Sequence, residues 1–172
     1  MSAANGALVT PALREALAAD DVPEDVAAFM DMIADRNDER NQRLRAMMLD
    51  ATALLNTAGI TPVYLKGMAI WAASRPDAES YPRMMSDVDL LVAPDETQKA
   101  LEALTAGGFR ILERHGEHLH AVADLCRDGD VGVLDLHRRP PGPAALAALF
   151  DREADTVATP WPGEARIPSP AH

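Results

Sequence analysis

The stretch Asp87-Val88-Asp89-Leu90-Leu91-Val92 decides the fold class, because polar and apolar residues alternate in it as they do along a half-buried strand. In such a strand Asp87 and Asp89 point to one face, and Val88, Leu90 and Val92 point to the other. Two carboxylates on neighbouring positions of one face repel each other, and burying them unpaired is costly. Mg²⁺ or Mn²⁺, which prefer hard oxygen ligands, would remove that conflict. An edge strand with its polar face in water is the competing interpretation.

A second segment, Val131-Gly132-Val133-Leu134-Asp135-Leu136-His137, again sets an acidic residue between apolar ones and puts His137 on the face of Asp135. If this strand lies beside the first, three carboxylates converge. Three carboxylates can hold two metal ions, which activate an attacking oxygen and stabilise a leaving pyrophosphate. The alternative is a solvated Asp135 on a hairpin.

Lys66-Gly67 follows the short apolar segment 61–65 and precedes a predicted helix over Met68–Ser74. A glycine at such a junction lets the backbone approach a phosphate, and the start of the helix offers free N–H groups. Lys66 would add a point charge to the same phosphates. A tight turn with a surface lysine is the other interpretation.

The remaining pattern predicts an α+β (mixed α/β) fold with helices first and then a small mixed sheet of four or five strands flanked by helices. Helical periodicity appears in short stretches before residue 34 and in a longer amphipathic helix over Asn37–Asn56. Arg127-Asp128-Gly129-Asp130 predicts a hairpin, since Asp-Gly suits a tight turn. We divide the chain into an N-terminal flexible or helical segment (1–22), a main domain (23–150) and a Pro-rich C-terminal segment (151–172).

Composition limits the function classes. The 172 residues fit one domain, and 16 Lys plus Arg against 27 Asp plus Glu give a net charge of −11. That balance argues against binding long nucleic acid but not against a nucleotide substrate, whose charge metal ions can carry. We expect no membrane segment and no secretory signal. Cys126 is the single cysteine, which fits a reducing cytoplasm.

These motifs occur in the order of a known group. The chain resembles the uncharacterised nucleotidyltransferase family, within the polymerase-β-like nucleotidyltransferase superfamily, over roughly Ala46 to His137. The resemblance rests on Leu65-Lys66-Gly67, Tyr81-Pro82-Arg83, Ser86 to Val92, and Leu134-Asp135-Leu136-His137. It implies a polymerase-β-like nucleotidyltransferase core. Members of the family usually continue into a helical region, so the resemblance implies that the 172 residues are the catalytic core alone.

The resemblance also implies roles for individual residues. The metal-binding and catalytic carboxylates would be Asp87, Asp89 and Asp135, and the residues around the nucleotide would be Lys66, Gly67, Arg83 and His137. Met68 stands where the superfamily has the serine of a Gly-Ser pair that grips the phosphates. Lys-Gly is typical of this particular family.

We therefore predict a metal-dependent enzyme that moves a nucleoside monophosphate from a nucleoside triphosphate to an acceptor hydroxyl, on a small molecule or a protein, and releases pyrophosphate. One alternative is a catalytically inactive module with the same fold, which Met68 favours. Another is a metal-dependent phosphohydrolase. For the cluster His115, His118 and His120 we favour a polar or substrate-facing surface over a zinc site, because no second group of Cys or His ligands has a familiar spacing.

Overall fold

The structure is a computed structural model that describes residues 9–17, 22–143, 145 and 149–169. The helices are α2 (Thr10–Ala16), α3 (Glu24–Thr57), α4 (Lys66–Ser74), the short 3-10 helix η2 (Pro94–Glu96) and α5 (Thr97–Ala106). The strands are β1 (Val63–Tyr64), β2 (Asp87–Leu91), β3 (Arg110–Arg114), β4 (Ala121–Cys126), β5 (Val133–His137), β6 (Thr156–Ala158) and β7 (Arg166–Pro168).

All of these strands form one mixed sheet in the order β3-β4-β5-β2-β1-β7-β6. β2 pairs parallel with β5 and antiparallel with β1, so the strand with the two aspartates is central. The predicted mixed α+β class is confirmed, but the sheet has seven strands where we expected four or five. β6 and β7 escaped prediction because three-residue strands in a Pro-rich segment are too short to show alternation. Through β6 and β7, residues 156–168 of the Pro-rich segment therefore extend the sheet.

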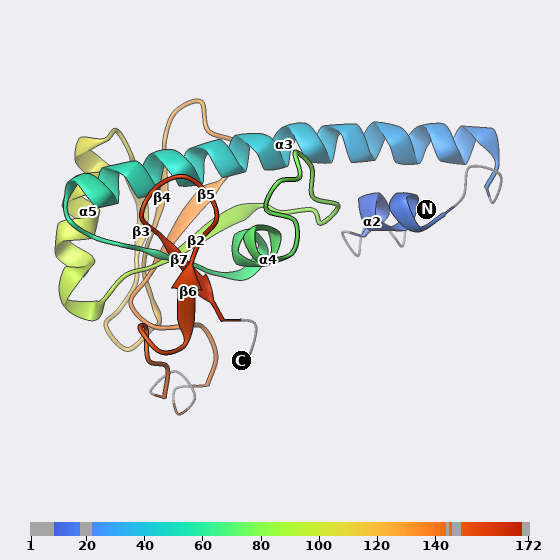
Figure 1. The fold of residues 1–172 in the computed structure, drawn as a ribbon. Coiled ribbons are helices and arrows are strands. Elements are labelled where there is room, and N and C mark those ends of the chain that lie inside the picture. Colours follow the sequence, from blue (N-terminus) through green and yellow to red (C-terminus); the bar gives the residue numbers. More distant parts are fainter. Residues whose placement is uncertain (1–8, 18–21, 144, 146–148, 170–172) are drawn as a thin grey trace.

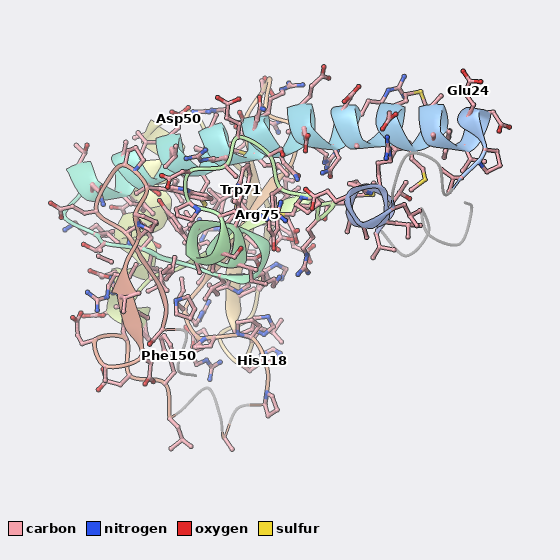
Figure 2. All side chains as sticks on the ribbon, turned by 45° about the vertical axis from the view of Figure 1, so that its right-hand side comes forward. Glu24, Asp50, Trp71, Arg75, His118 and Phe150 are labelled. Carbon is pink, nitrogen blue, oxygen red and sulfur yellow. The ribbon has the colours of Figure 1, made fainter. Side chains whose placement is uncertain are left out.

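Helix α3 is one continuous helix of 34 residues, although the sequence suggested a separate helix beginning at Asn37. Asn37 does not begin a helix. Its side chain is buried, and its amide donates a hydrogen bond of 3.0 Å to the backbone oxygen of Tyr81. One half of α3 crosses the sheet, and the other projects beyond it with α2 alongside (Figure 1). Figure 2 shows Glu24 at the projecting end and Asp50 over the body of the protein. No helix in the described ranges is long and apolar enough to cross a membrane.

The main core lies between one face of the sheet and the helices α3, α4 and α5, which meet it on that face. The alternation predicted for β2 and β5 supplies its centre, since Val88, Leu90, Leu134 and Leu136 are fully buried. They pack against side chains of α3 such as Leu44 and Met48. In the part of the chain that the structure describes, the other face carries a small apolar group of Val63, Leu65 and Leu91, with Phe150 against it. That face is therefore the one on which polar side chains can gather.

An aromatic cluster fastens the C-terminal segment to the helices. Trp71 of α4 meets Trp161 edge to face at 5.4 Å between ring centroids and stacks on Tyr81 at 5.7 Å. The Arg45 guanidinium of α3 lies 4.4 Å from the Trp161 ring and 5.5 Å from the Trp71 ring. Cation–π contacts of this kind stabilise by about 0.5–2 kcal/mol. The cluster joins α3 and α4 to the segment between β6 and β7.

Candidate active site

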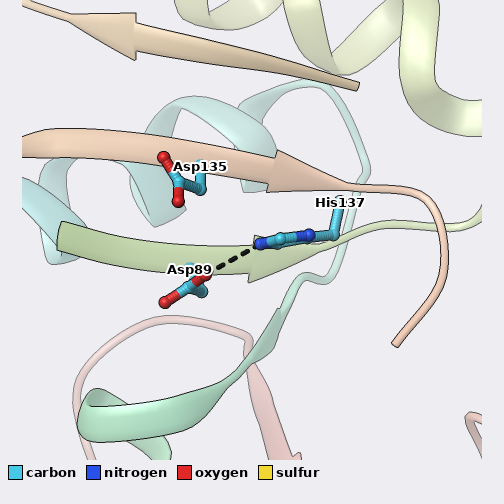
Figure 3. A group of neighbouring side chains, drawn as sticks. All are labelled: Asp89, Asp135 and His137. Atoms are coloured by element: carbon cyan, nitrogen blue, oxygen red, sulfur yellow. Dashed lines mark hydrogen bonds and ion pairs between the residues drawn. The ribbon is translucent and has the colours of Figure 1, made fainter. Parts of the chain in front are cut away.

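The two acidic strands lie side by side, as the sequence analysis required. β2 and β5 are parallel neighbours, and Asp89 is the register partner of Asp135, while Leu91 is the partner of His137. Register partners in neighbouring strands point to the same face. Figure 3 shows Asp89, Asp135 and His137 together on adjoining strands. Each of these three offers a ligand atom within 4.8 Å of the others.

Asp89 is the centre of this group and is only 2% exposed. His137 donates its Nε2–H to Asp89 Oδ1 at 2.8 Å, and Lys66 Nζ lies 2.5 Å from the same oxygen. Burial raises the pKa of Asp89, but the hydrogen bonds from His137 and Lys66 outweigh it and hold that pKa below its usual range. Asp89 is therefore an anion with two cation-capable partners.

Lys66 reaches Asp89 from an unusual backbone conformation. It is the first residue of α4 and has a φ of +48°, where residues other than glycine are uncommon. Its neighbour Gly67 packs closely against the loop before β2, since a Cβ there would lie 2.5 Å from Met85 Sδ. The Leu65 N–H also donates to the backbone oxygen of Asp89 at 3.1 Å. The ion pair of Lys66, the close packing of Gly67 and the hydrogen bond of Leu65 thus hold the start of α4 against β2 and the loop before it.

Asp135 lacks the neutralising contacts of Asp89. Burial, followed by the charges of Asp89, Asp124 and Asp87, raises the pKa of Asp135 to about 6. Asp124 lies opposite it on β4, where the two are register partners. The sequence motifs did not single out Asp124. A hairpin register centred on Gly129-Asp130 would have placed it there, but the turn motif alone does not choose between that register and its neighbours.

Asp87 and Arg83 lie further from the centre. Asp87, at the start of β2, is half-buried and accepts a hydrogen bond of 3.2 Å from the Ser86 hydroxyl. Its charge contributes to the raised pKa values of Lys66 and Asp135, so it faces the same side of the sheet. Arg83 is exposed and lines a separate depression near Val9 and Ser74. The structure brings Lys66, Asp89, Asp135 and His137 together and leaves Arg83 outside that group.

The three clustered histidines do not converge on one another. His115 Nε2 pairs with Asp124 Oδ1 at 2.8 Å, and that hydrogen bond raises the pKa of His115. The His120 ring stacks on the His137 ring with 5.3 Å between centroids. Arg139 holds the connecting segment by donating to the backbone oxygens of residues 117–119. His115 and His120 thus border the acidic group from two sides.

The donor set fits a divalent metal ion. The carboxylates of Asp89 and Asp135 face one another across neighbouring strands, and hard oxygen ligands of this kind suit Mg²⁺ or Mn²⁺. Burial first, and then the nearby carboxylates, raise the pKa of Asp135, so its ionised form gains from a bound cation. His137 already bonds to Asp89, so it can orient that carboxylate toward a metal ion.

The sheet and its acidic face define a nucleotidyltransferase fold. The chain belongs to the uncharacterised nucleotidyltransferase family, whose model matches residues 1–172. This confirms the resemblance stated from the motifs.

Two solved structures are similar to this chain. ANT(2″)-Ia in complex with adenylyl-2″-tobramycin matches with a TM-score of 0.52 and 16% identity, over 72% of this chain and 68% of that one. The lincosamide antibiotic adenylyltransferase LnuA, with lincomycin bound, matches with a TM-score of 0.44 and 20% identity, over 70% of this chain and 64% of that one. Comparison with curated protein sequences gave no match. At 16% identity, the similarity to ANT(2″)-Ia supports the fold alone.

Proposed function

We propose that the protein transfers a nucleoside monophosphate from a nucleoside triphosphate to a hydroxyl group of an acceptor, with release of pyrophosphate. The observation that supports this most is the register pairing of Asp89 and Asp135 beside Lys66 at the start of α4. Carboxylates that can hold metal ions then lie next to a lysine and the free N–H groups of a helix, which suit the phosphates.

In this proposal Asp87, Asp89 and Asp135 hold one or two Mg²⁺ or Mn²⁺ ions, which supply charge neutralisation for the phosphates. Lys66, released from Asp89, pairs with a phosphate oxygen, and Gly67 lets the chain approach it. His137 keeps Asp89 oriented. Asp135 also serves as the general base that accepts the proton of the acceptor hydroxyl.

ATP is the first donor to test, because the matched structure of ANT(2″)-Ia holds an adenylyl product. The acceptor in this proposal is a small molecule or a protein side chain. Long nucleic acid is not expected, given the net charge of −11. The lone Cys126 fits a cytoplasmic location.

Calorimetry with a non-hydrolysable ATP analogue, with and without Mg²⁺, tests the site. We expect metal-dependent binding by the wild type and a loss on the order of a hundredfold in Asp89→Asn, because a central ligand is removed. Asp128→Asn is the matched control, since that side chain is 92% exposed on a hairpin turn. Equal binding by Asp89→Asn and the control would contradict the proposal.

A binding module without catalysis is the second candidate. Met68 is buried and gives the start of α4 no hydroxyl to hold a phosphate. Such a module would show no metal-dependent binding of the triphosphate. Product analysis separates transfer from hydrolysis, since transfer yields pyrophosphate and a phosphohydrolase yields inorganic phosphate.

A further inference from the structure

A groove of about 550 Å³ lies between α3 and the segment that leads into β2. Its size falls within the range of about 300–1,000 Å³ that is usual for small-molecule sites. Ile33, Met84 and Val131 give it an apolar wall. The proposed catalytic residues do not account for this groove, since its lining stops at Ser86, one residue before Asp87.

The groove is positively charged in an acidic protein. Arg36, Arg40 and Arg43 line it from one side of α3, and Glu39 is the acidic residue in its lining. Arg40 Nε donates to the backbone oxygen of Met85 at 2.8 Å. Arg43 uses one terminal nitrogen to reach the backbone oxygen of Gly129 at 2.9 Å. Both arginines keep other N–H groups for a ligand, and among the described residues no hydrogen-bond or ion-pair partner occupies Arg36.

The groove meets the catalytic face at the start of β2. Ser86 lines the groove, and its hydroxyl bonds to Asp87, the next residue along the chain. Met85 lines it too and packs against Gly67 at the start of α4. Val131, on the wall, leads into β5, whose Val133 is the register partner of Asp87. Ser86 and Val131 therefore put this end of the groove beside the starts of β2 and β5, next to Asp87.

We propose that this groove binds the acceptor and that the acceptor is an anion, with a carboxylate or phosphate group on an apolar body that also carries the reacting hydroxyl. The inference rests on the proposed function. The arginines suit the anionic group because guanidinium pairs with carboxylate and phosphate through parallel hydrogen bonds. The apolar wall suits a carbon skeleton better than a triphosphate, for which Lys66 and the start of α4 are placed.

Methionine methyl NMR on the full chain can locate a ligand, because Met84 and Met85 both line the groove. Their signals are assigned with Met84→Leu and Met85→Leu. The probes share one hydroxyphenyl body: 4-hydroxyphenylacetate, 4-hydroxybenzylphosphonate, 4-hydroxyphenylacetamide and tyramine. We expect the two anions to shift these signals and the amide and amine to bind at least about tenfold more weakly. The anion that binds with the higher affinity then shows whether the acceptor carries a carboxylate or a phosphate group.

Arg36→Gln and Arg43→Gln should each weaken binding of the anions several-fold, and together about tenfold. The control is Arg110→Gln, which removes an arginine that is 61% exposed on the outer strand β3 and should change nothing. Equal binding of tyramine, unmoved Met84 and Met85 signals with both anions, or full binding by the double variant would overturn the anionic groove.

A kinetic measurement tests the acceptor role separately. With saturating Mg·ATP, the better anion should increase pyrophosphate release, and Arg36→Gln should raise its KM while leaving the Kd of Mg·ATP unchanged. Displacement of the anion by the non-hydrolysable ATP analogue would overturn the acceptor assignment. If the wild type binds no triphosphate in the presence of Mg²⁺, the proposed function fails, and the acceptor assignment falls with it even where the methyl shifts show an anionic groove.

Discussion

The two faces of β2 and β5 come from the same ten residues and have opposite characters. On one face Val88, Leu90, Leu134 and Leu136 are fully buried under α3. On the other, Asp89 and Asp135 stand close together with His137 buried beside them, and Asp87 lies further out at the start of β2. Because side chains alternate along a strand, one step in sequence separates a residue that holds the sheet in place from one that is available for chemistry.

This contrast teaches that stability and activity are separable in these strands. Burial of apolar side chains stabilises the first face by about 25 cal/mol for each Å² removed from water. The second face gathers like charges, which destabilise the metal-free protein. Substitutions on the first face should lower stability and spare activity, and substitution of Asp135 on the second should do the reverse.

The largest change in stability is expected from the apolar face. Leu90→Ala should lower the free energy of unfolding by about 3 kcal/mol, because it leaves a cavity in a fully packed core. Urea denaturation measures it, with Leu112→Ala as a matched control, since Leu112 is 53% exposed. Metal-dependent nucleotide binding per folded molecule should be retained. If Leu90→Ala stayed as stable as the wild type but lost nucleotide binding, stability and activity would not be separable between the two faces.

The polar face should respond in the opposite direction. The pKa of Asp135 lies near 6 in the folded protein, above its usual value of 3.8, so ionised Asp135 opposes folding at pH values above 6. Asp135→Asn should therefore stabilise the metal-free protein by about 1–2 kcal/mol at pH 7.5. The gain should vanish as the pH falls through 6 toward 4, where the wild-type carboxyl is protonated. Denaturation series at several pH values test this, and a gain independent of pH would contradict it.

A smaller effect is expected at the start of α4. Lys66→Gly and Lys66→Ala both remove the ion pair with Asp89, but only glycine adopts a φ of +48° without strain. The glycine variant should be the more stable of the two by about 1 kcal/mol. Thermal unfolding of both gives the difference. Equal stability would mean that this backbone conformation relaxes once the lysine is gone.

The smallest effect is expected at the border of the acidic group. The hydrogen bond to Asp124 raises the pKa of His115, so the pair stabilises the fold below about pH 6.5, and this stabilisation is lost as the pH rises through the raised pKa. His115→Gln should cost about 0.5 kcal/mol at pH 6 and almost nothing at pH 9. A loss of the same size at both pH values would point to packing instead.

Most of the sheet that carries the site could be predicted from the sequence. Alternation identified β2 and β5, and the shared face of Asp87 and Asp89 followed from the period of two. The parallel pairing of these strands did not follow from either segment alone, because it depends on the chain crossing between them. The register that sets Asp89 beside Asp135 is seen only in the structure.

The other differences also have physical causes. Asn37 resembles a residue that begins a helix, but tertiary contacts override local preference when its amide satisfies a loop carbonyl. The groove beside Ser86 could not be predicted, because its walls come from α3, the loop before β2 and the segment before β5. Such a site exists only after the fold brings three distant segments together.

The aromatic cluster also gives the molecule a built-in optical reporter. Trp71 and Trp161 are its two tryptophans, and they lie in contact at a single junction between α4 and the C-terminal segment. Emission at 295 nm excitation therefore comes from one place in the protein. If β6 and β7 separate from the helices before the rest of the sheet unfolds, the tryptophan emission should shift to longer wavelengths at that step. Because Trp71 is five residues from Lys66 on α4, the same signal can follow nucleotide binding without a label.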